Sequence, residues 1–279
     1  MRKIKCKTII NAVKYLCAKS NFELPEDVLK SLIQSINLET GVGRDILKEI
    51  IANAKIAKKL QYPLCQDTGV ANFFVKLGND VCIEQKSIYY AINKGVSLGY
   101  ISNYLRKSIV SDPIKRTNTK NNTPANIYID IVSGNKIEIV FFPKGGGSEN
   151  ASELKMLTPS VGWKGIKEFI LDVINNKAEN ACPPLIIGIG IGGDFASVGL
   201  LSKKALLREI GSVNPNKKYF DREQELLNDI NKLGIGPMGI GGKVTALAVF
   251  IESKPTHISS LPVAVNIQCH SHRKKMIII

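Results

Sequence analysis

The sequence has no long uncharged hydrophobic run. Hydrophobic residues make up 44% of the 279 residues, yet no apolar run reaches the roughly 18 residues that a membrane helix needs. The longest such stretch, 185–193, is only as long as a strand and is interrupted by glycine. With 22% charged residues, the composition also excludes wholesale disorder. We therefore expect a soluble globular protein without a membrane segment.

Cysteine is sparse as well. Six cysteines in a chain of this length are too few for a disulfide scaffold, and no secretory hydrophobic region precedes them. Residues 1–21 carry six basic side chains and no acid, which is also seen in transit peptides. However, residues 8–19 have the spacing of an amphipathic helix, and Pro25 with two following acids is typical of a second helix start. We expect a mature helix and a cytoplasmic, reducing location.

Acidic residues are the minority charge. The chain has 38 Lys and Arg against 24 Asp and Glu, a net charge of +14. Such an excess is compatible with nucleic-acid binding, because neutralisation of phosphates drives that affinity. The basic residues are mostly lysines, are dispersed and form no run of five. This favours a solvated lysine-rich surface and leaves an acidic partner or an anionic substrate open.

Hydrophobic periodicity predicts both helices and strands. The predicted helices cover 8–19, 25–36, 43–59, 86–100, 160–175, 195–210 and 221–233. The predicted strands cover 70–77, 126–132, 136–142, 185–191, 244–252 and 262–268. The turn residues 133–135 predict a hairpin over 126–142, and the Asn-, Thr- and Lys-rich segment 111–122 predicts a surface loop. We expect an α/β fold of mixed sheets flanked by helices, in one domain over 1–279 that is mainly helical over 1–60.

Two glycine-rich segments resemble nucleotide-binding motifs without matching them. Residues 188–193 satisfy G-x-G-x-x-G, but no acidic residue ends a second strand about 20 residues later. A turn at which the backbone approaches another group closely is the favoured interpretation. Residues 234–243 end in Gly-Lys, but Val244 follows the lysine and Pro237 replaces the first glycine, which excludes a P-loop. Their backbone N–H groups could still hold an anion.

The cysteines fall into two groups. Three lie in apolar patterns and are predicted to be small buried hydrophobes: Cys6, Cys17 and Cys82. The other three lie in polar contexts at element boundaries, where side chains can converge: Cys65, Cys182 and Cys269. Their separations of 117 and 87 residues match no local zinc or ferredoxin signature. The spacing alone leaves open whether these three share a metal.

Blocks of residues over nearly the whole chain match one known pattern. They are Arg2-Lys3-Ile4, Leu24–Asp27, Pro63–Gly69, Leu105-Arg106, Asp112-Pro113, Asn121–Ala125, Gly145–Asn150, Cys182–Pro184, Gly188–Asp194, Gly236–Gly239, Gly241-Gly242, Thr256-His257 and Asn266–Cys269. In this order they are similar to the class I (iron–sulfur) fumarate hydratase family and its sister, L(+)-tartrate dehydratase. The resemblance is to the N-terminal domain, which is a separate alpha subunit in two-subunit members.

The resemblance implies a [4Fe-4S] cluster held by Cys65, Cys182 and Cys269. Three thiolates leave one iron without a protein ligand, and this vacancy suits a Lewis acid rather than an electron carrier. The implied reaction is the reversible hydration of fumarate to L-malate, a step of the tricarboxylic acid cycle. The open iron would bind the hydroxyl and a carboxylate of malate.

The resemblance also implies substrate-binding residues. Fumarate and malate are dianions, so they require cationic and N–H donors. Arg106 would hold a carboxylate through two hydrogen bonds, as guanidinium geometry allows. Gln66 and the backbone N–H groups of Gly146 and Gly147 would add further hydrogen bonds. Without the resemblance, Arg106 would be interpreted as a surface ion-pair residue.

Two residues are implied to handle the proton of the departing water. Asp67 is two residues from Cys65, and His257 lies twelve residues before Cys269. Taken alone, Asp67 is typical of a turn, and His257 is typical of a structural or surface histidine. The matched blocks favour the catalytic interpretation of both.

The family also implies a partner. Its C-terminal domain supplies the catalytic base and further cations, and the present chain has no room for that domain after Cys269. We therefore expect a beta subunit that shares the site, a small dicarboxylate substrate, and neither nucleic acid nor membrane as partner. The segment 271–279 departs from the family pattern, and its Ile triplet is compatible with an interface strand or an ordered end.

Two alternatives stay open at this point. L(+)-tartrate dehydratase uses the same cluster chemistry on a substrate with one more hydroxyl, which a small change of the pocket can accommodate. The other class is a non-catalytic basic binding protein. That alternative predicts salt-dependent binding to duplex nucleic acid and no iron.

Overall fold

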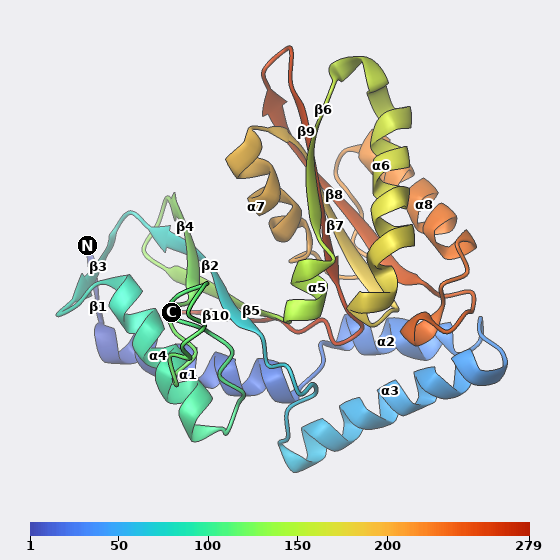
Figure 1. Ribbon diagram of the computed structural model, residues 1–279. Coiled ribbons are helices and arrows are strands. Elements are labelled where there is room, and N and C mark those ends of the chain that lie inside the picture. The colour runs from blue at the N-terminus through green and yellow to red at the C-terminus, as the bar shows by residue number, and fades with distance from the viewer. The chain divides into compact units, whose positions relative to one another are not determined.

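The computed structural model describes all 279 residues, which form two compact units (Figure 1). Unit 1 comprises 1–25, 54–146 and 273–279, and unit 2 comprises 26–53 and 147–272. Each unit contains its own four-stranded sheet and its own hydrophobic core. Helices and mixed sheets confirm the predicted α/β class.

Unit 1 is built on a sheet with the strand order β10-β5-β2-β4. The strands are β2 (Val70–Gly78), β4 (Asn126–Val132), β5 (Ile137–Lys144) and β10 (Lys275–Ile278). The central strand β2 runs parallel to β4 and antiparallel to β5, and β10 is antiparallel to β5. The C-terminal Ile triplet therefore lies largely within an edge strand of this sheet.

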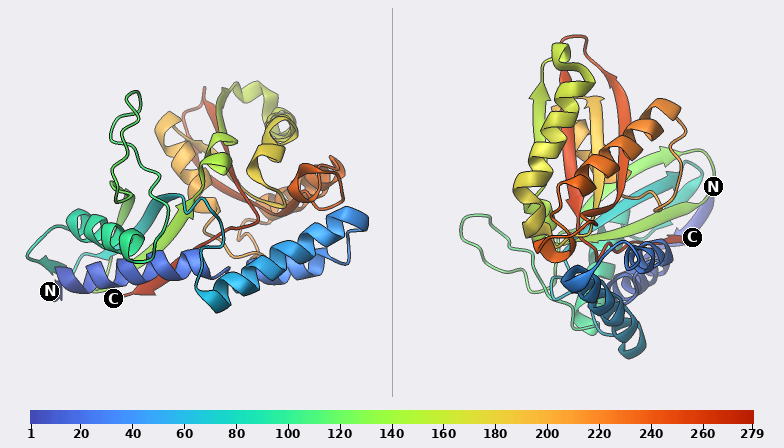
Figure 2. Two further views of the ribbon diagram at one scale, coloured as in Figure 1. Left: turned by 60° about the horizontal axis from the view of Figure 1, so that its bottom comes forward. Right: turned by 90° about the vertical axis from the view of Figure 1, so that its right-hand side faces the viewer.

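Two helices share the core of unit 1 with the sheet. They are α1 (Cys6–Phe22) and α4 (Ile88–Ser102), which lie side by side in both views of Figure 2. Buried side chains of α1, α4, β2 and β5 form one cluster, in which Phe73 and Phe141 have ring centroids 5.0 Å apart. Two short parallel strands, β1 (Arg2–Lys5) and β3 (Val81–Glu84), pair with each other.

The predicted hairpin over 126–142 is wrong, because β2 lies between β4 and β5. Alternating strands pair with whichever neighbour buries their apolar face, and β2 offers the fully buried Phe73. The turn crosses the end of β2: Gly134 N–H donates to Asn79 Oδ1 (3.0 Å), and Asp80 N–H donates to the Gly134 carbonyl (3.0 Å). Local alternation could not distinguish this split arrangement from a hairpin.

Unit 2 contains a sheet with the order β6-β9-β7-β8. Its strands are β6 (Glu153–Leu157), β7 (Leu185–Gly193), β8 (Ala246–Thr256) and β9 (Leu261–Gln268). Helices α6 (Gly162–Lys177) and α8 (Lys217–Lys232) cover one face, and α7 (Phe195–Ala205) covers the other (Figure 1). The remaining helical elements are α2 (Glu26–Ser35), α3 (Gly41–Leu60), α5 (Gly146–Asn150) and the short 3₁₀ turns η1 (Pro159–Val161), η2 (Ala178–Ala181) and η3 (Pro237–Gly239).

The two sheets have the same connectivity. In each, the central strand is parallel to the strand that follows a helical crossover and antiparallel to the next one. The start of the central strand and the end of its antiparallel neighbour therefore lie at the same end of each sheet, which we call its edge from here on. In unit 1 that edge joins the segment 63–69 to 145–146, and in unit 2 it joins 182–184 to 269–270.

The strand β7 explains the first glycine-rich segment. Ile187, Ile189 and Ile191 belong to the core shared with α6 and α8, while the alternate positions Gly188 and Gly190 face α7. A Cβ at Gly188 would lie 2.2 Å from the Ser202 carbonyl oxygen, and one at Gly190 would lie 2.4 Å from that of Val198. The predicted close backbone approach is confirmed, although at these two glycines it occurs within the strand and not at a turn.

The end of the second glycine-rich segment binds the carboxylate of Glu39, a residue of the same chain. The backbone N–H groups of Lys243 and Val244 both donate to Glu39 Oε1, each at 2.6 Å. Glu39 is only 3% exposed, and its carboxylate satisfies these donors. The segment therefore closes a loop of unit 2.

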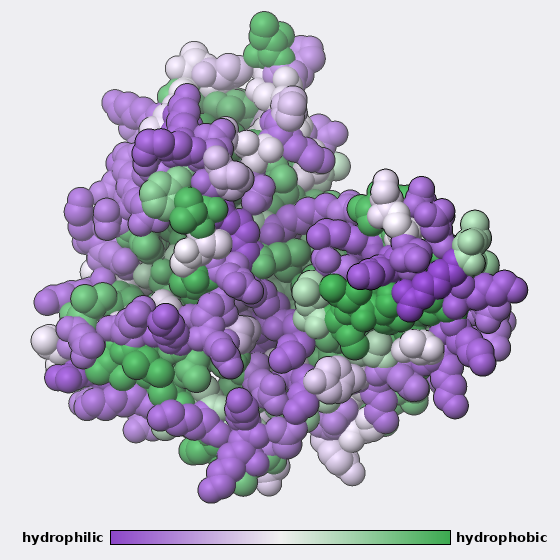
Figure 3. Space-filling view, turned by 180° about the vertical axis from the view of Figure 1, so that it is seen from behind, coloured by the Kyte–Doolittle hydropathy of each residue, from purple (hydrophilic) through white to green (hydrophobic).

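All predicted helices and strands are present, with ends that differ by up to five residues. The pattern missed four short strands (β1, β3, β6 and β10) and the five-residue α5. Cys6 and Cys17 are buried as predicted, whereas Cys82 is half-buried. Hydrophilic side chains cover most of the face in Figure 3, around separate apolar patches. No helix combines the length and apolar content that crossing a bilayer requires.

Candidate functional site

The segment Pro63–Gly69 of unit 1 forms a turn immediately before β2. Cys65 is half-buried in it and Gln66 is exposed. The Asp67 carboxylate accepts two backbone hydrogen bonds, from Gly69 N–H to Oδ1 (2.9 Å) and from Gly146 N–H to Oδ2 (2.7 Å). Asp67 therefore links the turn to the segment that follows β5, and it occupies the Gly146 N–H that the sequence assigned to substrate.

Side chains of α4 and of the loop 103–125 hold the end of this turn. The Tyr100 hydroxyl donates to the carbonyls of Thr68 (2.9 Å) and Gly69 (3.2 Å), and Asn122 Nδ2 donates to the Gly69 carbonyl (3.1 Å). Burial raises the pKa of the Tyr100 hydroxyl, which keeps it protonated and able to donate. The turn is thus fixed by neutral donors from inside the unit.

Arg106 adjoins the same turn. Its main-chain carbonyl accepts a hydrogen bond from Thr68 Oγ1 (2.9 Å), while its side chain is exposed. The guanidinium forms no hydrogen bond or ion pair with the rest of the chain. The structure therefore brings Arg106 to the turn of Cys65, Gln66 and Asp67 with its fork of donors free.

Arg273, which the sequence analysis missed, reaches this turn from the C-terminal segment. It is 1% exposed, and its two terminal nitrogens donate to Asn21 Oδ1 (2.9 Å) and to the Asp67 carbonyl (3.0 Å). Asn21 also accepts the Leu64 N–H at its own carbonyl (2.8 Å). No periodic or motif signal marks Arg273, because it lies in the segment that departs from the family pattern.

Unit 2 brings two cysteine segments together. Cys182 follows η2 in a left-handed conformation (φ 52°), just before β7, and Cys269 follows β9. Because β7 and β9 are antiparallel, these two positions share one edge of the sheet. His270 donates its N–H to the Cys182 carbonyl (3.3 Å), and its ring Nδ1 lies 3.0 Å from the same oxygen. Cys182 is exposed and Cys269 is half-buried.

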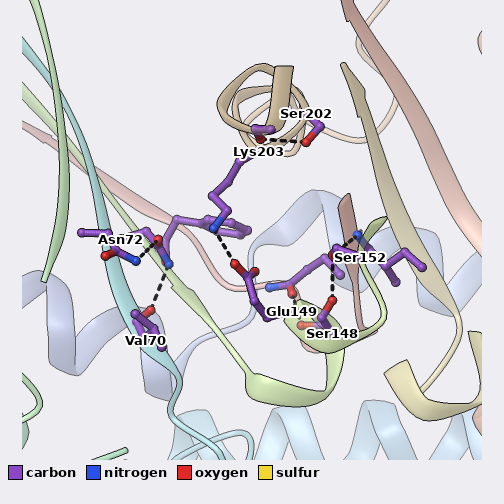
Figure 4. A network of polar contacts seen from close by, with 12 residues as sticks. Val70, Asn72, Ser148, Glu149, Ser152, Ser202 and Lys203 are labelled. Atoms are coloured by element: carbon purple, nitrogen blue, oxygen red, sulfur yellow. Dashed lines mark hydrogen bonds and ion pairs between the residues drawn. The ribbon is translucent and has the colours of Figure 1, made fainter. Parts of the chain in front are cut away.

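The helix α5 is attached to the same edge (Figure 4). Ser148 Oγ donates to Oε1 of Gln268 (2.9 Å), a fully buried residue next to Cys269. Ser152 Oγ accepts the Ile267 N–H (3.0 Å) and donates to the Ser148 carbonyl (2.9 Å).

The glycine that precedes Ser148 also lies close to the cysteine segment. A Cβ at Gly147 would lie 3.0 Å from the Asn180 carbonyl, two residues before Cys182. Gly147 thus belongs to the edge of the sheet that carries Cys182 and Cys269. Glu149, the next residue of α5 after Ser148, forms an ion pair with Lys203 of α7 (2.9 Å).

His257 lies at the other end of the sheet. It follows β8, and its Nδ1 is 2.7 Å from Ser259 Oγ in the exposed connection to β9. The length of β9 separates it from Cys269, about 23 Å at roughly 3.3 Å per residue. The structure therefore does not bring His257 to the edge that carries Cys182 and Cys269, although only twelve residues separate it from Cys269.

The donor chemistry of this edge suits a soft metal centre. All six cysteines are free thiols, and thiolates are the preferred ligands of iron–sulfur clusters. Unit 2 supplies an adjacent pair of cysteine segments, and unit 1 presents Cys65 on a turn with Gln66 and Asp67. No group of three or more His, Cys, Asp or Glu side chains converges as a metal site in the structure.

Comparison with known proteins places these features in a family context. The profile of the family described as fumarate hydratase (Fumerase) matches residues 10–278. A Methanocaldococcus jannaschii protein with the provisional name L(+)-tartrate dehydratase subunit alpha is 45% identical over 273 residues, 95% of each chain. The L(+)-tartrate dehydratase subunit alpha of Escherichia coli O157:H7 is 36% identical over 263 residues, 92% of this chain and 86% of the relative.

Proposed function

Because the chain belongs to the fumarate hydratase (Fumerase) family, we propose that it is the alpha subunit of an iron–sulfur hydro-lyase that interconverts fumarate and L-malate. The observation that carries this proposal is the contact between the Cys182 and Cys269–His270 segments. A purely structural pair of strand ends does not need a cysteine on each.

Three residues would hold a [4Fe-4S] cluster: Cys65, Cys182 and Cys269. When bound, the cluster supplies a Lewis-acidic iron without a protein ligand, which makes the substrate hydroxyl a better leaving group. Cys269 directly follows β9, while Cys182 and Cys65 lie three and five residues before β7 and β2.

The substrate is a dianion, and the chain's free donors match it. Arg106 offers an exposed guanidinium that can hold a carboxylate through two hydrogen bonds. Gln66 and the Gly147 N–H add neutral donors. Gly146 N–H instead holds Asp67 Oδ2, so it acts on the substrate through that carboxylate or is released when substrate binds.

Asp67 is the group to which we assign proton handling in this chain. Its carboxylate is held by two N–H donors, which orient both oxygens. His257 lies at the opposite end of β9 from Cys269, so we give it no role at the edge of unit 2 that carries the cysteines.

A second polypeptide completes the proposed enzyme. The relatives are named as alpha subunits, and we infer that a beta subunit supplies the remaining catalytic groups. Assays of the purified chain with and without that subunit test the inference. Full hydratase turnover by the chain alone would contradict it.

The first experiment is anaerobic reconstitution of the full chain with iron and sulfide. We expect about four irons and four sulfides per chain and a visible absorption band. Cys182→Ser should lose most of this iron, while Cys82→Ser, at a half-buried position outside the site, should retain it. A colourless wild-type chain, under conditions that load a known cluster protein, would refute the proposal.

L(+)-tartrate is the second candidate substrate, because relatives that are 45% and 36% identical to the chain carry that enzyme's name. It differs from malate by one hydroxyl, which a small pocket change accommodates. The ratio of kcat/KM for L-malate and L(+)-tartrate, measured on the reconstituted two-subunit complex, decides between the two substrates.

A further inference from the structure

Arg273 is a buried cation without a counter-ion. Its side chain is 1% exposed, and its hydrogen-bond acceptors are two neutral oxygens, Asn21 Oδ1 and the Asp67 carbonyl. Its Nε has no hydrogen-bond partner, and the guanidinium pairs with no carboxylate of the chain. Burying an unpaired charge is costly, which makes Arg273 a candidate for a functional role.

Arg273 and its partner Asn21 together contact the turn on both sides of Cys65. Asn21, in the last turn of α1, accepts Leu64 N–H at its carbonyl (2.8 Å) and Arg273 at its side chain (2.9 Å). Asn21 is itself held, because its Nδ2 donates to the Cys17 carbonyl (2.9 Å). Arg273 also donates a hydrogen bond to the Asp67 carbonyl (3.0 Å), which links Asn21 to the other end of the turn. Cys65 and Gln66 thus lie between Leu64 and Asp67, and both of these residues are linked by hydrogen bonds to Asn21, directly or through Arg273.

We propose that Arg273 is a positioning residue, which fixes the turn of Cys65, Gln66 and Asp67 and whose buried charge favours an anionic group bound at that turn. The second part rests on the proposed function. A cluster ligated by thiolates and a dicarboxylate are both anionic, and either would supply the charge that Arg273 lacks in the chain by itself.

Lysine and methionine separate the two parts of the proposal. Arg273→Lys keeps the charge, but a single ammonium does not reproduce the planar fork that reaches two acceptors. Arg273→Met removes the charge and both hydrogen bonds while keeping a long side chain. Lys275→Met is the matched control, because it removes a partly exposed cation two residues away whose only ion pair is a 3.8 Å contact with Glu23.

The test is hydrogen exchange of the full chain without iron, followed at the amides of Leu64 and Gly69. We expect exchange to be about tenfold faster in Arg273→Met and about threefold faster in Arg273→Lys. Lys275→Met should exchange like the wild type. Unchanged exchange in a folded Arg273→Met chain overturns the positioning role. Where that variant does not fold, as judged by circular dichroism, the result for Arg273→Lys decides in the same way.

Iron content after reconstitution tests the charge. Arg273→Lys should retain at least about twice as much iron as Arg273→Met, and equal contents would overturn this part. A wild-type chain that takes up no iron would instead refute the proposed function, while the exchange experiment would still decide the positioning role. The two failures are therefore distinguishable.

Discussion

Gly190→Ala tests the conclusion that the glycine-rich strand β7 serves packing. The added Cβ would lie 2.4 Å from the Val198 carbonyl oxygen and 2.8 Å from the Ser202 amide nitrogen, both backbone atoms of α7. Ordinary contact begins near 3.4 Å, so α7 would have to move by about 1 Å. Overpacking of this kind costs about 1–3 kcal/mol. In a domain of about 150 residues, this lowers Tm by roughly 2–12 °C.

The same helix offers a control of opposite sign. Gly199 lies inside α7, and a Cβ there would meet only Leu154 Cδ1, at 3.8 Å. Gly199→Ala should therefore stabilise the chain by about 0.5–1 kcal/mol, through the higher helix propensity of alanine. Thermal and urea unfolding of both variants, followed by circular dichroism, measure the difference. A Gly190→Ala chain as stable as the wild type would refute the packing argument.

Three further predictions concern charge, substrate and the α5 attachment. Burial raises the pKa of Glu252, so ionising this carboxyl destabilises the folded state above that pKa but not in acid. The stability of Glu252→Gln relative to the wild type should therefore increase as the pH rises from 4 to 8 in urea titrations. A gain in stability confined to acid would contradict this sign. Arg106→Lys should raise KM of the two-subunit complex about tenfold with a smaller change in kcat, whereas an unchanged KM would remove Arg106 from the substrate site. Ser148→Ala leaves buried Gln268 Oε1 without that donor, and chemical unfolding should show a loss of about 1–2 kcal/mol; no loss would mean that another donor replaces the serine.

Much of the fold follows from local pattern. Residues 187–192 alternate isoleucine and glycine, and in the structure these isoleucines pack in the core with α6 and α8, while Gly188 and Gly190 face α7. The helices were equally accessible, because their apolar faces recur every three or four residues. The turns around Cys65, Cys182 and Cys269 were also predicted as polar boundaries of elements.

Long-range pairing was less accessible. The sequence of each strand does not indicate that β2 lies between β4 and β5, because the alternation of apolar and polar residues within a strand does not determine which strand pairs with it. The short sequence separation between His257 and Cys269 did not indicate their distance in unit 2, because the twelve residues include the extended strand β9. Arg273 gave no signal either, since its role depends on Asn21 and Asp67, both more than 200 residues away.

The nesting of the units has a consequence for the order in which the chain can fold during synthesis. Unit 2 consists of two segments, 26–53 and 147–272, that interrupt unit 1, and residues 273–279 return to unit 1 with β10 and Arg273. Domains fold largely as they leave the ribosome, at about 5–20 residues per second. The turn of Cys65 is translated early, yet it gains the support of Arg273 only after more than 200 further residues have been translated. Insertion of iron and sulfur at this turn would then follow the translation of Arg273.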